Sequence, residues 1–314
     1  MDLATQASVE GPLREGAYVR DPNSAPPPLI RRSALGDLRQ IALDFAKSKD
    51  LIYQLTLRDI RVRYKQAAFG FAWALLLPAA VIMAGMVIRY AVAYSNGRGM
   101  QTSALAGMAV KAVPWAFFVG CLNTSTPSLV ANMSLVTKIY FPREVLPLST
   151  VLAQTFDSSI GLLLVSLTLC VPFFGVTPSI QLLWVPVLLL LLWLLALGAG
   201  LFLACANLFF RDVKYLVQVF VTFGIFITPV ILDISAYGPK IAPYMMLNPV
   251  SPILEGLVLT IVAHHNLLDP FVTRTGFETW HPWYLAYSAL WAVGGLLLSS
   301  LFFHRSERRF AEIV

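Results

Sequence analysis

The sequence contains few charged residues, which make up 13% of its 314 positions. Soluble domains carry roughly 25% charged residues. Hydrophobic residues account for 57% of the chain, and the mean hydropathy is +0.70. This composition excludes an ordinary soluble protein. It predicts an integral membrane protein with one membrane domain and no large soluble domain beside it.

The motifs of common nucleotide-hydrolysing and hydrolytic enzymes are absent as well. The Walker A pattern G-x-x-x-x-G-K-[ST], the metalloprotease pattern H-E-x-x-H and the hydrolase pattern G-x-S-x-G do not occur. The four histidines form no metal-ligand pattern. Cys121, Cys170 and Cys205 each lie inside an apolar segment and are expected to be small packing residues. We therefore expect this chain to bind no metal or cofactor and to hold no catalytic residue.

Two segments precede the apolar part of the chain. Residues 1–36 are polar and interrupted by prolines, with no visible signal peptide, and they predict a disordered cytoplasmic tail. Residues 37–66 are charged yet periodic and predict an amphipathic helix in the membrane interface. Its apolar stripe holds Tyr53, Leu57, Ile60 and Tyr64, and its basic face holds Arg58, Arg61 and Lys65. That basic face fits either general attraction to anionic lipid or recognition of a phosphate-bearing lipid substrate.

Six apolar segments follow and are expected to cross the membrane as helices. They cover residues 67–94, 103–133, 145–171, 181–207, 215–233 and 283–303. Gly198 and Gly200 are expected to permit close helix packing, and Arg89 is expected to extend its side chain outward to the interface. Residues 234–281 are broken by prolines, and their apolar run is only about half the roughly 20 residues that a span needs. This pattern predicts a re-entrant hairpin between spans 5 and 6.

The placement of lysine and arginine indicates the orientation. Basic residues concentrate near both chain ends and in the connections after the second and fourth spans. Positive charge marks the cytoplasmic side, so both termini and these connections are expected there, with the hairpin outside. The net charge of +6 reflects this distribution and does not indicate nucleic-acid binding.

The expected fold class is an all-α integral membrane protein. It has six transmembrane helices, an N-terminal amphipathic interface helix and a re-entrant extracytoplasmic hairpin between spans 5 and 6. The transmembrane domain is expected to cover residues 67–304, and a cytoplasmic tail is expected over residues 305–314.

The connection after the second span, residues 132–147, contains more charged and aromatic residues than a simple link between two helices requires. It contains Lys138, Tyr140, Phe141, Arg143 and Glu144. These residues fit either an interfacial anchor at the lipid headgroups or a docking surface for a partner protein. A second polar connection contains Arg211 and Asp212. Since the chain has no nucleotide motif, energy for transport would have to come from a partner at such surfaces.

Asp157 is the one plausible acid well inside an expected span. Ionisable residues within membranes are functional candidates. A single aspartate makes a poor proton relay, and a hydrogen bond between helices explains it at least as well.

Several segments in the right order resemble the membrane subunits of ABC-2 type polysaccharide exporters. They are RDIRVRYK at 58–65 with GFAWAL at 70–75, KIYFPREVLP at 138–147, RDVKY at 211–215 with TPVI at 228–231, LNP at 247–249 with EG at 255–256, and ERRFA at 307–311. The resemblance runs from residue 58 to the C-terminus. The long proline-rich N-terminus and the extra length around residues 264–281 depart from the family pattern.

The resemblance implies a permease subunit in the bacterial cytoplasmic (inner) membrane that exports O-antigen, capsule or teichoic acid chains on an undecaprenyl pyrophosphate carrier. It implies a homodimer carrying two copies of a separate ATPase, which binds the ATP and Mg²⁺. The residues at the ATPase contact would be Lys138, Tyr140, Phe141, Arg143, Glu144, Arg211 and Asp212.

The same resemblance suggests a route for the substrate. The lipid pyrophosphate would enter at Arg58, Arg61, Arg63 and Lys65. Sugar rings slide along aromatic faces, so the path would be lined by Trp73, Trp115, Phe117 and Phe118, although these residues also fit ordinary helix packing. Asn248, Pro249 and Glu255 would shape the outer hairpin.

Three other functions remain open. An ABC-2 exporter of a small drug or lipid would lack an occluded route long enough for a glycan. A membrane enzyme acting on polyprenyl phosphates would need clustered acids or histidines, and the sequence offers only scattered ones. An ion-coupled transporter would need more charge inside the membrane than Asp157 supplies, or an inverted repeat, which we do not detect.

Overall fold

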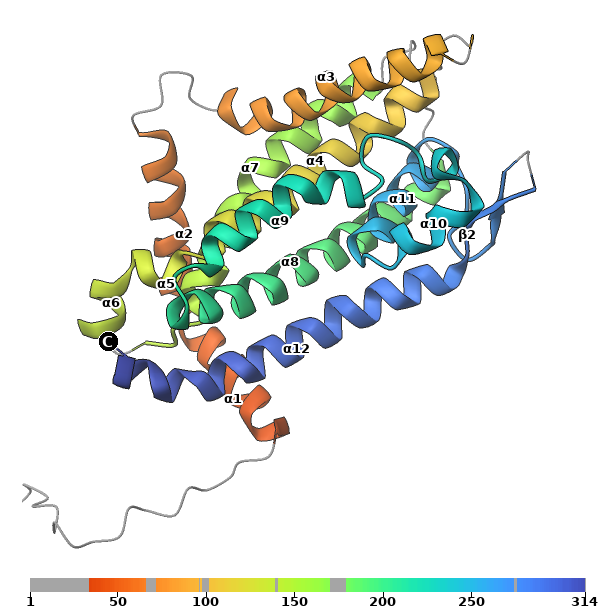
Figure 1. The fold of residues 1–314 in the computed structure, drawn as a ribbon. Coiled ribbons are helices and arrows are strands. Elements are labelled where there is room, and N and C mark those ends of the chain that lie inside the picture. Colours follow the sequence, from red (N-terminus) through yellow and green to blue (C-terminus); the bar gives the residue numbers. More distant parts are fainter. Residues whose placement is uncertain are drawn as a thin grey trace, which may run out of the picture. The chain divides into compact units, whose positions relative to one another are not determined.

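The computed structural model describes residues 34–65, 72–95, 97, 102–138, 141–169, 179–273 and 276–313. Most of the expected N-terminal tail lies outside these residues. The described part is almost entirely helical (Figure 1).

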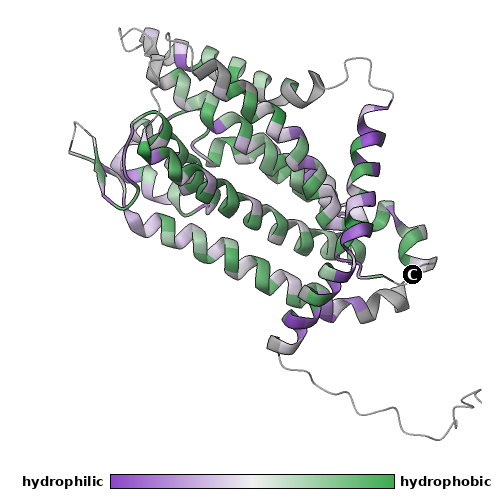
Figure 2. Ribbon diagram, turned by 180° about the vertical axis from the view of Figure 1, so that it is seen from behind, coloured by the Kyte–Doolittle hydropathy of each residue, from purple (hydrophilic) through white to green (hydrophobic). Residues whose placement is uncertain are grey.

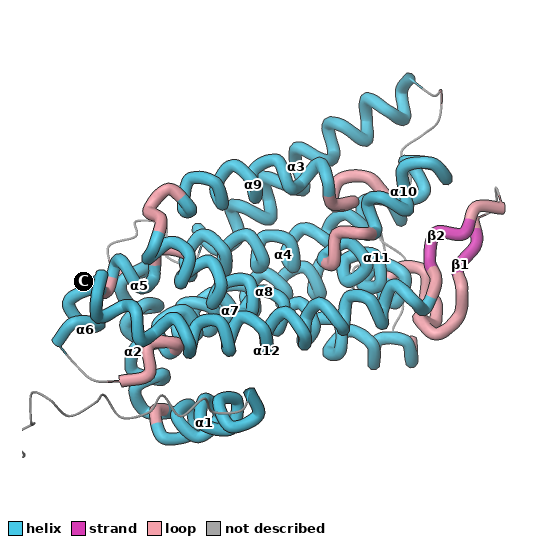
Figure 3. Tube along the Cα trace, turned by 60° about the horizontal axis from the view of Figure 1, so that its bottom comes forward, coloured by secondary structure: helices cyan, strands magenta, loops and turns pink. Residues whose placement is uncertain are grey.

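Apolar helices packed side by side make up most of this part (Figures 1 and 3). They are α3 (Ala72–Ser95), α4 (Thr102–Ser125), α7 (Val145–Leu169), α8 (Trp184–Phe209), α9 (Val213–Ile227) and α12 (Pro282–Ile313). Within the described residues, three stretches are long and apolar enough to cross a membrane: Leu105–Ser125, Ile180–Phe209 and Pro282–Glu307. Shorter apolar stretches include Ile82–Ala91, Val213–Ile227 and Val250–Ile261. The structure thus confirms a helical, multi-pass architecture in its coarse form.

Helix boundaries follow the sequence signals closely in most places. The second expected span, residues 103–133, forms a helix that runs unbroken through Pro114 and ends at Ser125, just before Pro127. The fifth expected span is shortened, because α9 ends at Ile227 and the chain turns at Thr228 and Pro229.

Close packing of α8 against α12 depends on Gly198. A Cβ atom added there would lie 2.9 Å from the backbone of Leu296. One added at Gly200 would lie 2.6 Å from the Ser125 hydroxyl. Both glycines therefore allow close helix contact, as the sequence predicted. Cys121 and Cys205 are buried without a disulfide, as expected, while Cys170 lies outside the described residues.

Four further helices gather at one end of these apolar helices (Figure 1). They are α1 (Ala34–Lys47), α2 (Lys49–Tyr64), α5 (Ser128–Ala131) and α6 (Met133–Lys138). Figure 2 shows hydrophilic residues concentrated on α1 and α2. The stretch that was expected to form one interfacial helix is divided into two helices at Ser48. α1 packs against α12, and α2 packs against α7.

The opposite end holds the segments between α9 and α12. They are η3 (Ile234–Tyr237), α10 (Gly238–Met246), α11 (Val250–Ile261), β1 (Phe271–Val272) and β2 (Glu278–Trp280), and η2 (Ile180–Leu183) contacts α11 there. The short helices α10 and α11 follow one another in this part of the chain.

The antiparallel ribbon of β1 and β2 was not expected, because its strands are too short to show an alternating pattern. Trp280 anchors it, fully buried, by donating its indole N–H to the carbonyl of Leu267 at 3.0 Å.

Candidate functional site

Helix α2 is fastened to α7 by polar contacts. The Arg63 guanidinium pairs with Asp157 and donates to the Gln154 side chain at 3.0 Å. One turn nearer the start of α2, Asp59 accepts a hydrogen bond from the Ser149 hydroxyl at 3.2 Å. Asp157 is only 5% exposed. The acid inside the expected third span therefore forms an ion pair with α2, which explains why α2 lies along α7.

Tyr64 strengthens the same contact. Its hydroxyl donates to Asp157. Burial raises the pKa of Tyr64 above its usual value, although the neighbouring Arg63 cation lowers it in part. The hydroxyl therefore stays protonated near neutral pH and remains a donor. The buried face of α2 contains Leu55, whereas Tyr53 of the expected apolar stripe is 61% exposed.

The remaining basic residues of α2 face outward. Arg58 forms a 2.8 Å ion pair with its neighbour Asp59. Arg61 and Lys65 are exposed. All three line an open hollow on α2 of about 630 Å³, together with Gln54, Leu57, Val62 and Tyr64. The structure therefore separates the four basic residues of the expected substrate entrance: Arg63 points inward to α7, and the others surround a surface hollow.

The segment before α7 contacts the end of α12. Arg143 lies 3.7 Å from the Glu307 carboxylate and donates to the Glu307 carbonyl at 3.2 Å. The Glu144 carboxylate, 3% exposed, lies 3.5 Å from Nδ1 of His304. Phe141 is half-buried and packs against the core. Tyr140 and the side chain of Lys138 lie outside the described residues.

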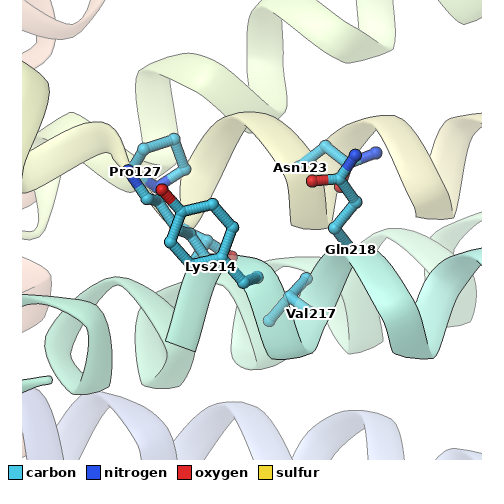
Figure 4. A pocket seen from close by; sticks show the side chains of 7 residues that line it. Asn123, Pro127, Lys214, Val217 and Gln218 are labelled. Atoms are coloured by element: carbon cyan, nitrogen blue, oxygen red, sulfur yellow. The ribbon is translucent and has the colours of Figure 1, made fainter. Parts of the chain in front are cut away.

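A polar hollow of about 350 Å³ separates the end of α4 from the start of α9. Figure 4 shows Asn123 and Pro127 on one side of it and Lys214 and Gln218 of α9 on the other. The Lys214 ammonium lies 4.7 Å from the centre of the Tyr215 ring.

The turn before α9 exposes two of the expected partner-contact residues. Arg211 and Asp212 are both exposed there. The Asn207 side-chain oxygen accepts a hydrogen bond from the backbone N–H of Lys214 at 3.2 Å, and this bond holds the turn to the end of α8.

The expected path-lining aromatics are packed inside the helices of this one chain. Trp115 and Phe118 lie 6.2 Å apart, centre to centre, and Trp115 packs against Gly224 of α9. Phe117 contributes to an apolar cavity of about 140 Å³ between α4, α7 and α8. The side chain of Trp73 lies outside the described residues. These rings now serve helix packing, so they could line a path only after the helices move.

Four charged side chains meet where α3 and α4 contact the segment after α9. Lys111, with no exposed surface, donates to Glu255 at 2.9 Å and to the Pro229 carbonyl at 2.9 Å, and it lies 3.4 Å from Asp233. Arg89 makes two 3.1 Å contacts with Asp233. The expectation that Arg89 extends outward was wrong, because it is 9% exposed and paired. This charge cluster ties α11, through Glu255, and the turn after α9, through Asp233, to α3 and α4.

Sequence reasoning missed the partners of these charges. Asp233, His304 and Glu307 were not singled out as site residues, and no local pattern marks them. One weak indication was available in the sequence. A cation inside an apolar helix needs an anion from elsewhere in the chain, because unpaired charge inside a membrane protein is costly.

A family model for ABC-2 type transporters matches residues 50–262. The chain belongs to the ABC-2 type transporter family. As an ABC-2 permease it is the membrane domain of a transporter and carries no ATPase domain of its own. Permeases of this family pair with an ABC ATPase and typically hold no cofactor.

Curated relatives are similar over most of their length. An O-antigen export system permease protein RfbA from Klebsiella pneumoniae is 26% identical over 206 residues, which cover 65% of this ABC-2 permease and 77% of the relative. The protein of the same name from Myxococcus xanthus is 27% identical over 225 residues, 70% of this chain and 83% of the relative.

Proposed function

We propose that this ABC-2 permease exports undecaprenyl-pyrophosphate-linked polysaccharide across the bacterial cytoplasmic membrane. The observation that carries the proposal is the similarity to O-antigen export permeases over about two thirds of the chain. The proposal includes six membrane spans, both termini in the cytoplasm, a homodimer and two ATPase subunits. The polar end with α1 and α2 would then be cytoplasmic, and α10, α11 and the ribbon extracytoplasmic.

Residues 141–147 are the proposed contact with the ATPase. Because α7 begins at Val145, a displacement of this segment reaches α7 directly. The Arg143–Glu307 and Glu144–His304 contacts link the same segment to α12. A displacement of this segment by the ATPase would therefore move both α7 and α12.

The proposed substrate entrance uses the exposed cations of α2. Arg61 and Lys65 border the hollow on this helix, and within the described residues neither forms an ion pair with a carboxylate. Exposed cations close together on one helix suit a pyrophosphate headgroup. Arg63 would contribute indirectly, by holding α2 against α7 through Asp157.

The polymer would pass between the two protomers. α9 exposes an apolar face at helical spacing, formed by Leu216, Val219, Phe220, Phe223 and Ile227. Such a face can meet lipid or a second copy. Outward movement of α9 would uncover Trp115 and Phe118 behind it, and these rings could then stack on sugars.

The test uses a bacterial strain from which the gene is deleted. We expect loss of long-chain surface polysaccharide and accumulation of the carrier-linked polymer inside, both reversed by the wild-type gene. Arg61→Glu with Lys65→Glu should restore export poorly while still assembling with the ATPase. Unchanged surface polysaccharide in the deletion strain would contradict the proposal, and altered export of a small lipid instead would favour the smaller-substrate exporter.

A further inference from the structure

Three side chains of metal-binding type meet where the start of α7 contacts the end of α12. Their ligand atoms, from Glu144, His304 and Glu307, all lie within 4.8 Å of one another. His304 and Glu307 are three residues apart on α12 and so share one face of the helix. Glu144 reaches them from the residue immediately before α7.

The Glu144 carboxylate is buried, and one of its oxygen atoms lacks a hydrogen bond among the described residues. It is 3% exposed, and its Oε1 atom accepts no hydrogen bond within the described part of the chain. A buried carboxylate oxygen without a hydrogen-bond partner costs free energy. The neighbouring Nδ1 of His304 is 3.5 Å away, longer than the 2.7–3.2 Å of a normal N–H···O bond. The long contact with His304 therefore compensates the buried Glu144 only in part.

The same 3.5 Å spacing suits a shared metal ion. Zinc bonds to nitrogen and oxygen of about 2.0–2.1 Å, at tetrahedral angles, place two ligand atoms about 3.4 Å apart. The spacing that is too long for a hydrogen bond thus agrees with two ligands of one cation.

The local charge also favours a cation. Two carboxylates, Glu144 and Glu307, face one guanidinium, that of Arg143. The carboxylates of Glu144 and Glu307 both lie beside the His304 ring, so a cation held there would be shared between them. Ligating carboxylates are commonly held by a further hydrogen-bond donor, and Arg143, 3.7 Å from Glu307, occupies that place.

We propose that Glu144, His304 and Glu307 bind a divalent transition-metal ion, with Zn²⁺ as the preferred species. One imidazole and two carboxylates form a ligand set that suits Zn²⁺, with remaining positions open to water. The ion would fasten the segment at residues 141–147, from which α7 starts, to the end of α12. This inference does not depend on the transported substrate.

The test uses the full-length chain in detergent, free of any affinity tag and stripped with EDTA. Calorimetric titration with Zn²⁺ should show one ion per chain. Glu144→Gln and His304→Gln should each weaken binding at least tenfold. Glu278→Gln and His281→Gln, which change exposed residues of the same types, should bind Zn²⁺ as the wild type does.

X-ray absorption of the zinc-loaded wild type tests the site without relying on the folding of any variant. We expect a shell of nitrogen and oxygen ligands that includes one imidazole. The proposal is overturned if the wild type binds no stoichiometric zinc, if both site variants bind it unchanged, or if the spectrum shows sulfur ligands or no imidazole.

Discussion

Lys111 offers the sharpest test of how the buried charges stabilise this permease. Lys111→Met removes the cation but keeps an unbranched side chain of similar length. Glu255, 5% exposed and 2.9 Å from the lysine ammonium, would then remain buried without its partner. Removing one member of a buried ion pair typically costs about 3–5 kcal/mol. Asp233 would keep Arg89, so most of the cost comes from Glu255.

Thermal unfolding in detergent, followed by tryptophan fluorescence, measures this cost. At about 2–4 °C per kcal/mol, Lys111→Met should lower the unfolding temperature by roughly 6 °C or more. Adding Glu255→Met to the same chain removes the orphaned anion and should recover a large part of the loss, because an apolar pair of similar volume can replace a buried ion pair. Lys240→Met, at an exposed position of α10, is the matched control and should leave the temperature unchanged.

Two results would refute this reasoning. The first is unfolding of Lys111→Met at the wild-type temperature, which would mean that the lysine does not compensate a buried charge. The second is a double variant less stable than the lysine variant alone, which would mean that the two side chains contribute separately and not as a pair.

Three further changes test other contacts. Arg63→Met should destabilise the protein by about 1–3 kcal/mol, less than the full cost of a buried pair because the arginine is partly exposed, and protease cleavage within α2 should report its release from α7. Gly198→Ala should cost about 1–3 kcal/mol in thermal unfolding, because the new Cβ would lie 2.9 Å from the α12 backbone. Arg143→Glu should reduce polysaccharide export at least tenfold by placing like charges together, and combining it with Glu307→Arg should restore part of the export, measured as surface polymer.

The first two of these changes each have a matched control. Arg61→Met removes an exposed arginine of the same helix and should leave α2 as protected from protease as in the wild type. Gly294→Ala adds a Cβ where no atom lies within 4 Å and should not lower the unfolding temperature. If Arg61→Met is cleaved by protease as readily as Arg63→Met, the Arg63–Asp157 contact is not what protects α2. If Gly294→Ala lowers the unfolding temperature as much as Gly198→Ala, the close approach of Gly198 to α12 is not the cause of that loss. For export, failure of the reciprocal charge exchange to improve on Arg143→Glu alone would contradict the proposed link to α12.

The apolar pattern by itself determined the helical class and several boundaries with good accuracy. The expected span at residues 145–171 appears as Val145–Leu169, and the close approach at Gly198 was predicted from glycine alone. Both signals are local, because a long apolar run has few alternatives to a helix in a membrane and a glycine permits contact wherever the partner lies. The order of the family motifs added the transporter class, which composition cannot supply.

Only the tertiary structure decided which charges meet. Arg63 resembled its neighbours on α2 in sequence, yet it turns inward to Asp157 while Arg61 faces outward. Glu144 and His304 are 160 positions apart and share no motif. Helical periodicity tells which residues lie on one face of a helix, but the pairing of two faces depends on how the helices pack, and that packing is a property of the whole chain.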